Sequence, residues 1–153
     1  MAEKVDSFTF TVEGVPVAKE RPRKAKDGHF YTPQKTKDHE ELIQQFWMAN
    51  GKKFVEGAIG MTVKAYFNIP KSASKVRVAQ MQNKEIRPTS KPDTTNVIKL
   101  VEDALNGLAY RDDSYIVRIV GEKYYSLEPR LEVEVFSLST LERRVLPKMK
   151  EDD

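Results

Sequence analysis

The residues best suited to catalysis lie in one segment of the chain, residues 91–113, which carries carboxylates at both ends. Asp93 stands near its start, and Asp112 and Asp113 close it. Carboxylate oxygens are ligands that Mg²⁺ prefers, and a bound Mg²⁺ activates water and stabilises charge on a phosphate. Lys99 adds a fixed positive charge that would stabilise a phosphoryl-transfer transition state. If the two ends converge in the fold, this segment forms a metal site for phosphodiester chemistry.

The same residues also have a simple structural interpretation. An acid at position 93 is favoured at the start of a helix by the helix dipole, and the Asp112–Asp113 pair is typical of a turn. Lys99 and Asp103 have the i,i+4 spacing of a surface ion pair, which stabilises a helix by only a few tenths of a kcal/mol. Spacing alone therefore leaves both interpretations open.

Basic residues are concentrated in two stretches of the chain. Residues 19–37 carry seven basic residues against two acidic ones, and residues 64–91 form a second basic stretch with one acid, although the net charge is only +3. Two such stretches around a carboxylate cluster indicate a surface that binds a polyanion such as nucleic acid, while an ordinary solvated face is the alternative for either stretch alone. The residues expected to contact phosphates are Lys19, Arg21, Arg23, Lys24 and Lys91.

The elements that position these residues follow from the spacing of apolar residues. Alternation of apolar and polar residues predicts strands, and apolar residues at helical spacing predict helices. The expected strands are Ser7–Glu13, Gly60–Ile69, Tyr115–Tyr125 and Arg130–Leu138. One expected helix begins at Pro33, capped by Thr32, and runs to about Asn50. A second is capped by Thr94 or Thr95 and ends at Gly107, and residues 72–83 form either a short helix or an ordered loop.

The helix after Thr94 is amphipathic: its apolar face is expected to pack in the core, and its polar face carries the candidate functional residues. On a helical wheel one arc faces the core and the opposite one is polar. The apolar arc contains Val97, Val101, Ala104, Leu105 and Leu108, and the polar stripe contains Asn96, Lys99, Asp103 and Asn106. Trp47, in the first helix, is expected to fill the core rather than to stack on a base.

The order of elements predicts a single α+β domain, a mixed and mostly antiparallel sheet with helices packed on one side. The domain is expected to span residues 1–139, and residues 140–153 to form a flexible tail. The 153 residues include no cysteine and two histidines, which excludes disulfides and thiolate zinc sites. Neither a signal peptide nor an apolar run of membrane length appears, so we expect a cytoplasmic protein.

A resemblance to a known family adds to this reading. The signature consists of Asp93, Asn96, Lys99, Asp103 followed by Ala-Leu, and the Asp112–Asp113 pair, in that order and spacing. With the basic loop at residues 14–23, it makes residues 8–138 resemble the RusA family of phage and prophage Holliday junction resolvases. The resemblance implies a RusA-like fold, a homodimer, and Mg²⁺-dependent paired nicks in four-way DNA during recombination and repair, with Mn²⁺ as a substitute. It also implies a metal held by Asp93, Asp113 and Asp112, with Lys99 catalytic.

One position departs from the family pattern, which has a second aspartate where this chain has Thr95. A hydroxyl is a weak Mg²⁺ ligand, so Thr95 would hold a metal-bound water or simply cap the helix. Asp112 or Glu40 could supply the missing charge, whereas Asp103 lies about 12 Å along the helix and has a supporting position, as does Asn96. The departure keeps two alternatives open: a nuclease for other branched DNA such as flaps and forks, and a non-catalytic DNA-binding protein.

Overall fold

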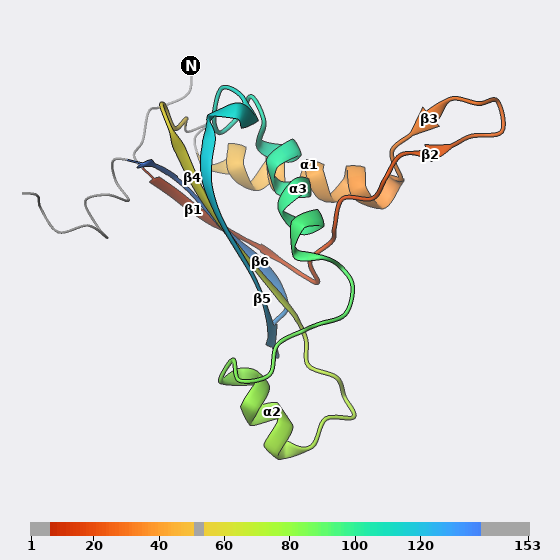
Figure 1. Ribbon diagram of the computed structural model, residues 1–153, viewed down its shortest axis with the longest axis vertical. Coiled ribbons are helices and arrows are strands. Elements are labelled where there is room, and N and C mark those ends of the chain that lie inside the picture. The colour runs from red at the N-terminus through yellow and green to blue at the C-terminus, as the bar shows by residue number, and fades with distance from the viewer. Residues whose placement is uncertain (1–6, 51–53, 139–153) are drawn as a thin grey trace, which may run out of the picture.

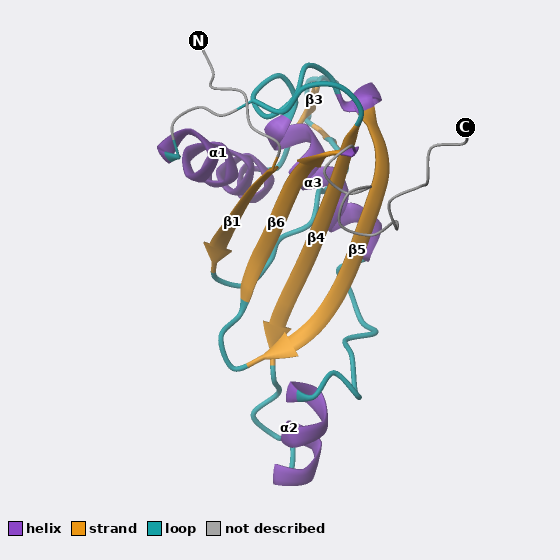
Figure 2. Ribbon diagram, turned by 90° about the vertical axis from the view of Figure 1, so that its left-hand side faces the viewer, coloured by secondary structure: helices purple, strands orange, loops and turns teal. Residues whose placement is uncertain are grey.

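The computed structural model describes residues 7–50 and 54–138, and they form a four-stranded sheet with helices against one face. The main strands are β1 (Ser7–Glu13), β4 (Ile59–Asn68), β5 (Ile116–Ser126) and β6 (Arg130–Ser137). They lie in the order β1-β6-β4-β5 (Figure 2). The β1–β6 and β6–β4 pairs are antiparallel and the β4–β5 pair is parallel, which confirms the predicted α+β fold with a mixed, mostly antiparallel sheet.

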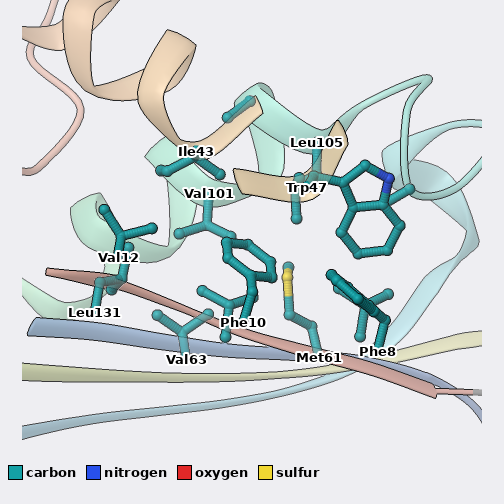
Figure 3. Packing of buried hydrophobic residues seen from close by; sticks show 14 of the residues in the cluster. Phe8, Phe10, Val12, Ile43, Trp47, Met61, Val63, Val101, Leu105 and Leu131 are labelled. Atoms are coloured by element: carbon teal, nitrogen blue, oxygen red, sulfur yellow. The ribbon is translucent and has the colours of Figure 1, made fainter. Parts of the chain in front are cut away.

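Helices α1 (Gln34–Ala49) and α3 (Thr94–Leu105) bury their apolar faces against the sheet (Figure 1). Trp47 of α1 is fully buried and packs edge-on against Phe8 of β1, with ring centroids 4.6 Å apart (Figure 3). The expected core position of Trp47 is therefore confirmed. The buried residues of α3 are Val97, Leu100, Val101, Ala104 and Leu105.

A glycine sets how closely α3 approaches the outer strand β5. An ideal Cβ built on Gly121 would lie 2.4 Å from Cδ1 of Ile98 and 3.1 Å from Cγ2 of Thr94. The first turn of α3 therefore lies directly over Gly121. Because Asp93 directly precedes α3, it lies near the part of β5 that contains Gly121.

The structure differs from the sequence prediction in two local features and decides a third, residues 72–83, for which the sequence left a short helix and a loop both open. The predicted loop after β1 contains a short hairpin, β2 (Arg23–Lys24) paired with β3 (Phe30–Tyr31), which projects away from the sheet (Figure 1). The N-cap of α1 is Pro33 rather than Thr32, since Pro33 has an extended ψ of 142° and the helix begins at Gln34. Residues 75–82 form helix α2 (Lys75–Gln82), begun by the Ser74 hydroxyl, which accepts a hydrogen bond from the Arg77 amide at 3.3 Å.

Helix α2 lies beyond the end of the sheet, so among the described helices α1 and α3 are the two that cover its inner face (Figure 2). No helix in residues 7–50 or 54–138 has both the length and the apolar character that a membrane span requires. The predicted tail, residues 140–153, lies outside the described residues, so its predicted flexibility stays a prediction.

Candidate functional site

A cleft of about 950 Å³ lies between the loop after β1 and the start of α3. The loop is tied to the helix because the Lys19 amide donates a hydrogen bond to the Asn96 carbonyl at 2.9 Å. Charged and polar residues that line the cleft are Lys19, Glu20, Arg21, Arg23, Lys35, Lys91, Asp93 and Asn96. The fold thus brings four of the five predicted phosphate-binding residues to the same cleft as Asp93. Lys35, which sequence reasoning counted in the basic stretch but did not single out, also belongs to it.

Asp93 stands at the rim of this cleft as the N-cap residue of α3, but its side chain makes no capping hydrogen bond. Its carboxylate instead accepts from Lys91 Nζ at 2.9 Å and is about half exposed. Thr94 and Thr95 are the first two residues of the helix, so the prediction that one of them is its N-cap is wrong. Thr95 and Asn96 are exposed beside Asp93, which leaves a group of oxygen donors open to solvent at the positive end of the helix dipole.

Deeper along α3, two lysines surround the carboxylate of Asp103. Lys19 Nζ lies 2.6 Å from Glu40 and 3.3 Å from Asp103, and Lys99 Nζ lies 3.4 Å from Asp103. Partial burial works against the Lys19 charge, but Glu40 and Asp103 outweigh it and raise the Lys19 pKa. Lys19 therefore holds the loop against α1 and α3 through ion pairs, which makes it a weaker candidate for a phosphate contact than the exposed Arg21. The predicted Lys99–Asp103 ion pair is confirmed.

The second group of acids lies at the other end of α3. Asp112 is the N-cap of the short 3₁₀ helix Asp113–Tyr115, and its side chain accepts a hydrogen bond from the Ser114 amide at 3.0 Å. Hydrogen bonds from Ser114 hold the Asp112 pKa below its usual value. Burial raises the pKa of nearby Glu102, and the charges of Asp113 and Asp103 act in the same direction. This end of α3 is therefore an acidic cluster in which the negative charges disfavour one another.

The two groups of carboxylates do not meet within the chain. Helix α3 has 12 residues and separates Asp93 from the acidic cluster by about 18 Å along its axis. Strand β5 gives a similar separation. Gly121 lies under the first turn of α3, and it is five residues, or about 17 Å, beyond Ile116 at the start of the strand. Residues 106–115 connect α3 to β5, and Asp113 lies only three residues before Ile116, which keeps it at that end. Within the described part of the chain, no group of three or more acids or histidines could hold a metal ion.

The projecting hairpin places further nucleic-acid candidates beside the cleft. Lys24 is exposed on β2, and Arg23 is exposed while pairing with Glu20 at 3.1 Å. Phe30 and Tyr31 of β3 are also exposed, with 69% of the Phe30 surface open to solvent. The hairpin therefore presents both positive charge and aromatic rings on which a base could stack.

Comparisons with known proteins cover most of the chain. Residues 13–136 match the family model described as endodeoxyribonuclease RusA, a range that includes the basic loop, the hairpin, α3 and β5. The chain is also similar to the uncharacterized protein YqaN of Bacillus subtilis strain 168, with 38% identity over 141 residues, which is 88% of this chain and 99% of that protein.

Proposed function

The chain belongs to the RusA family of endodeoxyribonucleases, divalent-metal-dependent enzymes that act on Holliday junctions, and from this premise we propose that it resolves four-way DNA by Mg²⁺-dependent paired nicks during recombination and repair. In this proposal Asp93 is a metal ligand and the cleft beside it binds the DNA backbone. Asp112 and Asp113 do not reach Asp93 within one chain. In this proposal the second chain of a homodimer supplies them as the remaining carboxylates of the metal site, and Lys99 is catalytic.

The observation that carries the proposal is the arrangement of the cleft. It joins a basic loop, the Asp93 carboxylate and the Asn96 amide on one surface. Cations in such a cleft attract a phosphate backbone without reading its sequence, and each neutralised phosphate adds a salt-sensitive increment to affinity. A phosphate held between Arg21 and Lys35 would lie on the same surface as the Asp93 carboxylate, which is where hydrolysis requires it.

The donors suit a hard cation in kind. The Asp93 carboxylate, the Thr95 hydroxyl and the Asn96 amide each carry an oxygen that can bind a cation, and none of the three residues has a thiol or an imidazole. Mg²⁺ is commonly bound through one or two carboxylates, with waters and substrate phosphates completing the shell. When bound, the cation supplies an activated water and stabilises charge on the phosphate. Mn²⁺ shares this preference for oxygen ligands and should substitute.

The chain's own residues would then act on the bound strand. Lys91 pairs with Asp93, and its ammonium group would be free to contact a phosphate if that carboxylate held a metal. Lys99 projects from the same polar stripe as Asn96, just over half exposed, and its charge would stabilise the transition state. Its pairing with Asp103 fixes where that charge lies, so Asp103 is a positioning residue.

Single-turnover cleavage of a labelled mobile four-way junction, run beside a gel-shift titration in EDTA, tests the proposal. Asp93→Asn and Asp113→Asn should each reduce cutting by at least about 100-fold while junction binding survives, because the change removes charge and preserves shape. Asp38→Asn, on the exposed surface of α1, is the matched control and should cut normally. An Asp93→Asn protein that cuts at the wild-type rate would overturn the metal site.

The same assay separates the remaining activities. Cutting of flaps or forks in preference to junctions would favour a nuclease for other branched DNA. Junction binding without any metal-dependent nick in the wild-type protein would favour a DNA-binding protein that has lost cleavage.

A further inference from the structure

The β2–β3 hairpin carries two aromatic rings that lie outside the hydrophobic core. Phe30 and Tyr31 of β3 are 69% and 42% exposed, and neither belongs to the buried cluster that holds α1 and α3 on the sheet. The hairpin that carries them projects away from the sheet (Figure 1). Exposed apolar residues occur singly on most proteins, whereas these two are adjacent and face the cations of β2, Arg23 and Lys24.

Each face of the hairpin combines one ring with one cation. In the antiparallel ladder Phe30 is opposite Lys24, and Tyr31 is opposite Arg23. Adjacent residues of a strand point to opposite faces, whereas directly opposed residues share a face. One face therefore carries Lys24 with Phe30, and the other carries Arg23 with Tyr31. The His29 ring lies on the second face as well, with its centroid 6.3 Å from that of Tyr31.

The tip of the hairpin is held by its own hydrogen bonds. The Ala25 amide donates to the His29 carbonyl at 2.8 Å, and the Gly28 amide donates to the Ala25 carbonyl at 3.0 Å. The Asp27 carboxylate accepts from the His29 amide at 3.2 Å. Gly28 has a φ of 94°, a conformation that suits glycine. A segment that is ordered before it binds loses less entropy on binding, so the two rings are presented on a preformed wedge.

The base of the hairpin opens onto the cleft that contains Asp93. Pro22 and Arg23 line this cleft together with Asp93 and Asn96. A DNA strand whose phosphates lie in the cleft would therefore pass beside the hairpin. Cations that hold a backbone and aromatic rings that stack on its bases are the combination with which proteins bind unpaired nucleotides. The cations thus favour nucleic acid, rather than an apolar protein surface, as the ligand of the two rings.

We propose that the hairpin is a wedge that stacks on the base pairs facing the branch point of the DNA, and that it thereby distinguishes a branch from linear duplex. The proposal rests on the proposed function, because it takes branched DNA as the substrate. In a linear duplex every internal base pair is covered on both sides, so a ring can enter only by unstacking two of them. Where arms meet, the last base pair of an arm has lost one neighbour and offers an open face. Phe30 and Tyr31, on opposite faces of the wedge, would cover the ends of two arms.

Fluorescence anisotropy in EDTA, with a four-way junction and a linear duplex of equal length, tests the wedge without any cleavage. Phe30→Ala should weaken junction binding by at least about 5-fold and leave duplex binding and the salt slope unchanged, because it removes a ring and no charge. Lys24→Ala, at the opposing position, should weaken binding to both substrates and reduce the salt slope by about one unit. Leu127→Ala, 66% exposed between β5 and β6, is the matched control and should change neither affinity.

A junction with abasic sites at its branch point tests the stacking itself. The wild-type protein should lose on this junction the affinity that Phe30→Ala loses on the intact one, and Phe30→Ala should lose no more, as a double-mutant cycle requires of two groups that interact. Abasic sites in the middle of the arms should leave binding unchanged. Phe30→Trp keeps an aromatic ring and should bind the intact junction at least as tightly as the wild type.

The outcomes separate the wedge from the proposed function. Phe30→Ala that binds the junction like the wild type, or that loses equal affinity for junction and duplex, would overturn the wedge alone. Additive losses from Phe30→Ala and the abasic sites would also overturn it, because the ring would then act on something other than those bases. A wild-type protein that binds the junction no more tightly than the duplex would overturn the proposed function and the wedge with it.

Discussion

Replacement of Lys91 by methionine should tighten metal binding at Asp93. Lys91 Nζ lies 2.9 Å from Asp93 Oδ1, and the side chains are 84% and 48% exposed. The lysine thus competes for an oxygen that the proposed metal requires. Methionine keeps most of the length and flexibility of the side chain and removes the competing charge.

The exposure of the pair sets the size of the effect. Two unit charges at this separation attract by about 1.4 kcal/mol in bulk water, and exposed pairs contribute about 0.2–1 kcal/mol once entropy is included. Lys91→Met should therefore lower the Kd for a divalent cation by about 1.4- to 5-fold at low ionic strength. In 1 M salt, where the Debye length is about 3 Å, most of this gain should disappear.

Titration of the DNA-free protein with Mn²⁺, followed by the electron paramagnetic resonance signal of the free ion, measures this Kd directly. Lys91→Arg keeps the charge and should bind Mn²⁺ like the wild type. Lys24→Met removes an exposed lysine from β2 and controls for net charge. The reasoning is refuted if Lys91→Met binds Mn²⁺ no more tightly than the wild type, or if Lys24→Met gives an equal gain.

Three further predictions concern DNA binding and stability. Arg21→Ala combined with Arg23→Ala should weaken junction binding and reduce the salt slope by about one unit per lost contact, measured by gel shift from 50 to 200 mM salt; unchanged salt dependence would remove this loop from the DNA surface. Gly60→Ala should destabilise the fold by about 1–3 kcal/mol and lower the Tm by several degrees in calorimetry. The reason is that a Cβ at this position would lie 2.3 Å from the Phe136 ring, and an unchanged Tm would show that the ring moves freely. Glu102→Gln should raise the Tm by about 1–2 °C at pH 7 and leave it unchanged at pH 3.5. The raised pKa of Glu102 means that the folded state disfavours the ionised carboxylate, so the protein loses stability as the pH rises through the titration of this group. An equal gain in Tm at both pH values would exclude this electrostatic cause.

Local patterning was sufficient to predict most of the elements and the family. Apolar spacing located α3 and its buried face, apart from Leu100, because the helical period depends only on neighbouring residues. Alternation located the four main strands to within one residue at either end. The β2–β3 hairpin was missed because two-residue strands carry too little pattern to distinguish them from a loop.

The signature residues were also readable from sequence, but the distances between them were not. The spacing of Asp93, Asn96 and Lys99 defines a polar stripe on one helix, and the structure gathers Asp93 and the basic loop around one cleft. Nothing local predicts that the Lys19 charge is neutralised by Glu40 and Asp103, since Glu40 lies on another helix.

Whether Asp93 and Asp113 share a site was decided by tertiary structure alone. Sequence determined that a helix and a short turn separate them, and therefore that about 18 Å of helix lies between. Which strand β5 joins, and in which direction, depends on long-range packing of α3 over Gly121 and on pairing with β4. That packing places the start of β5 at the end of α3 farthest from Asp93, so Asp112 and Asp113 lie away from Asp93 within one chain.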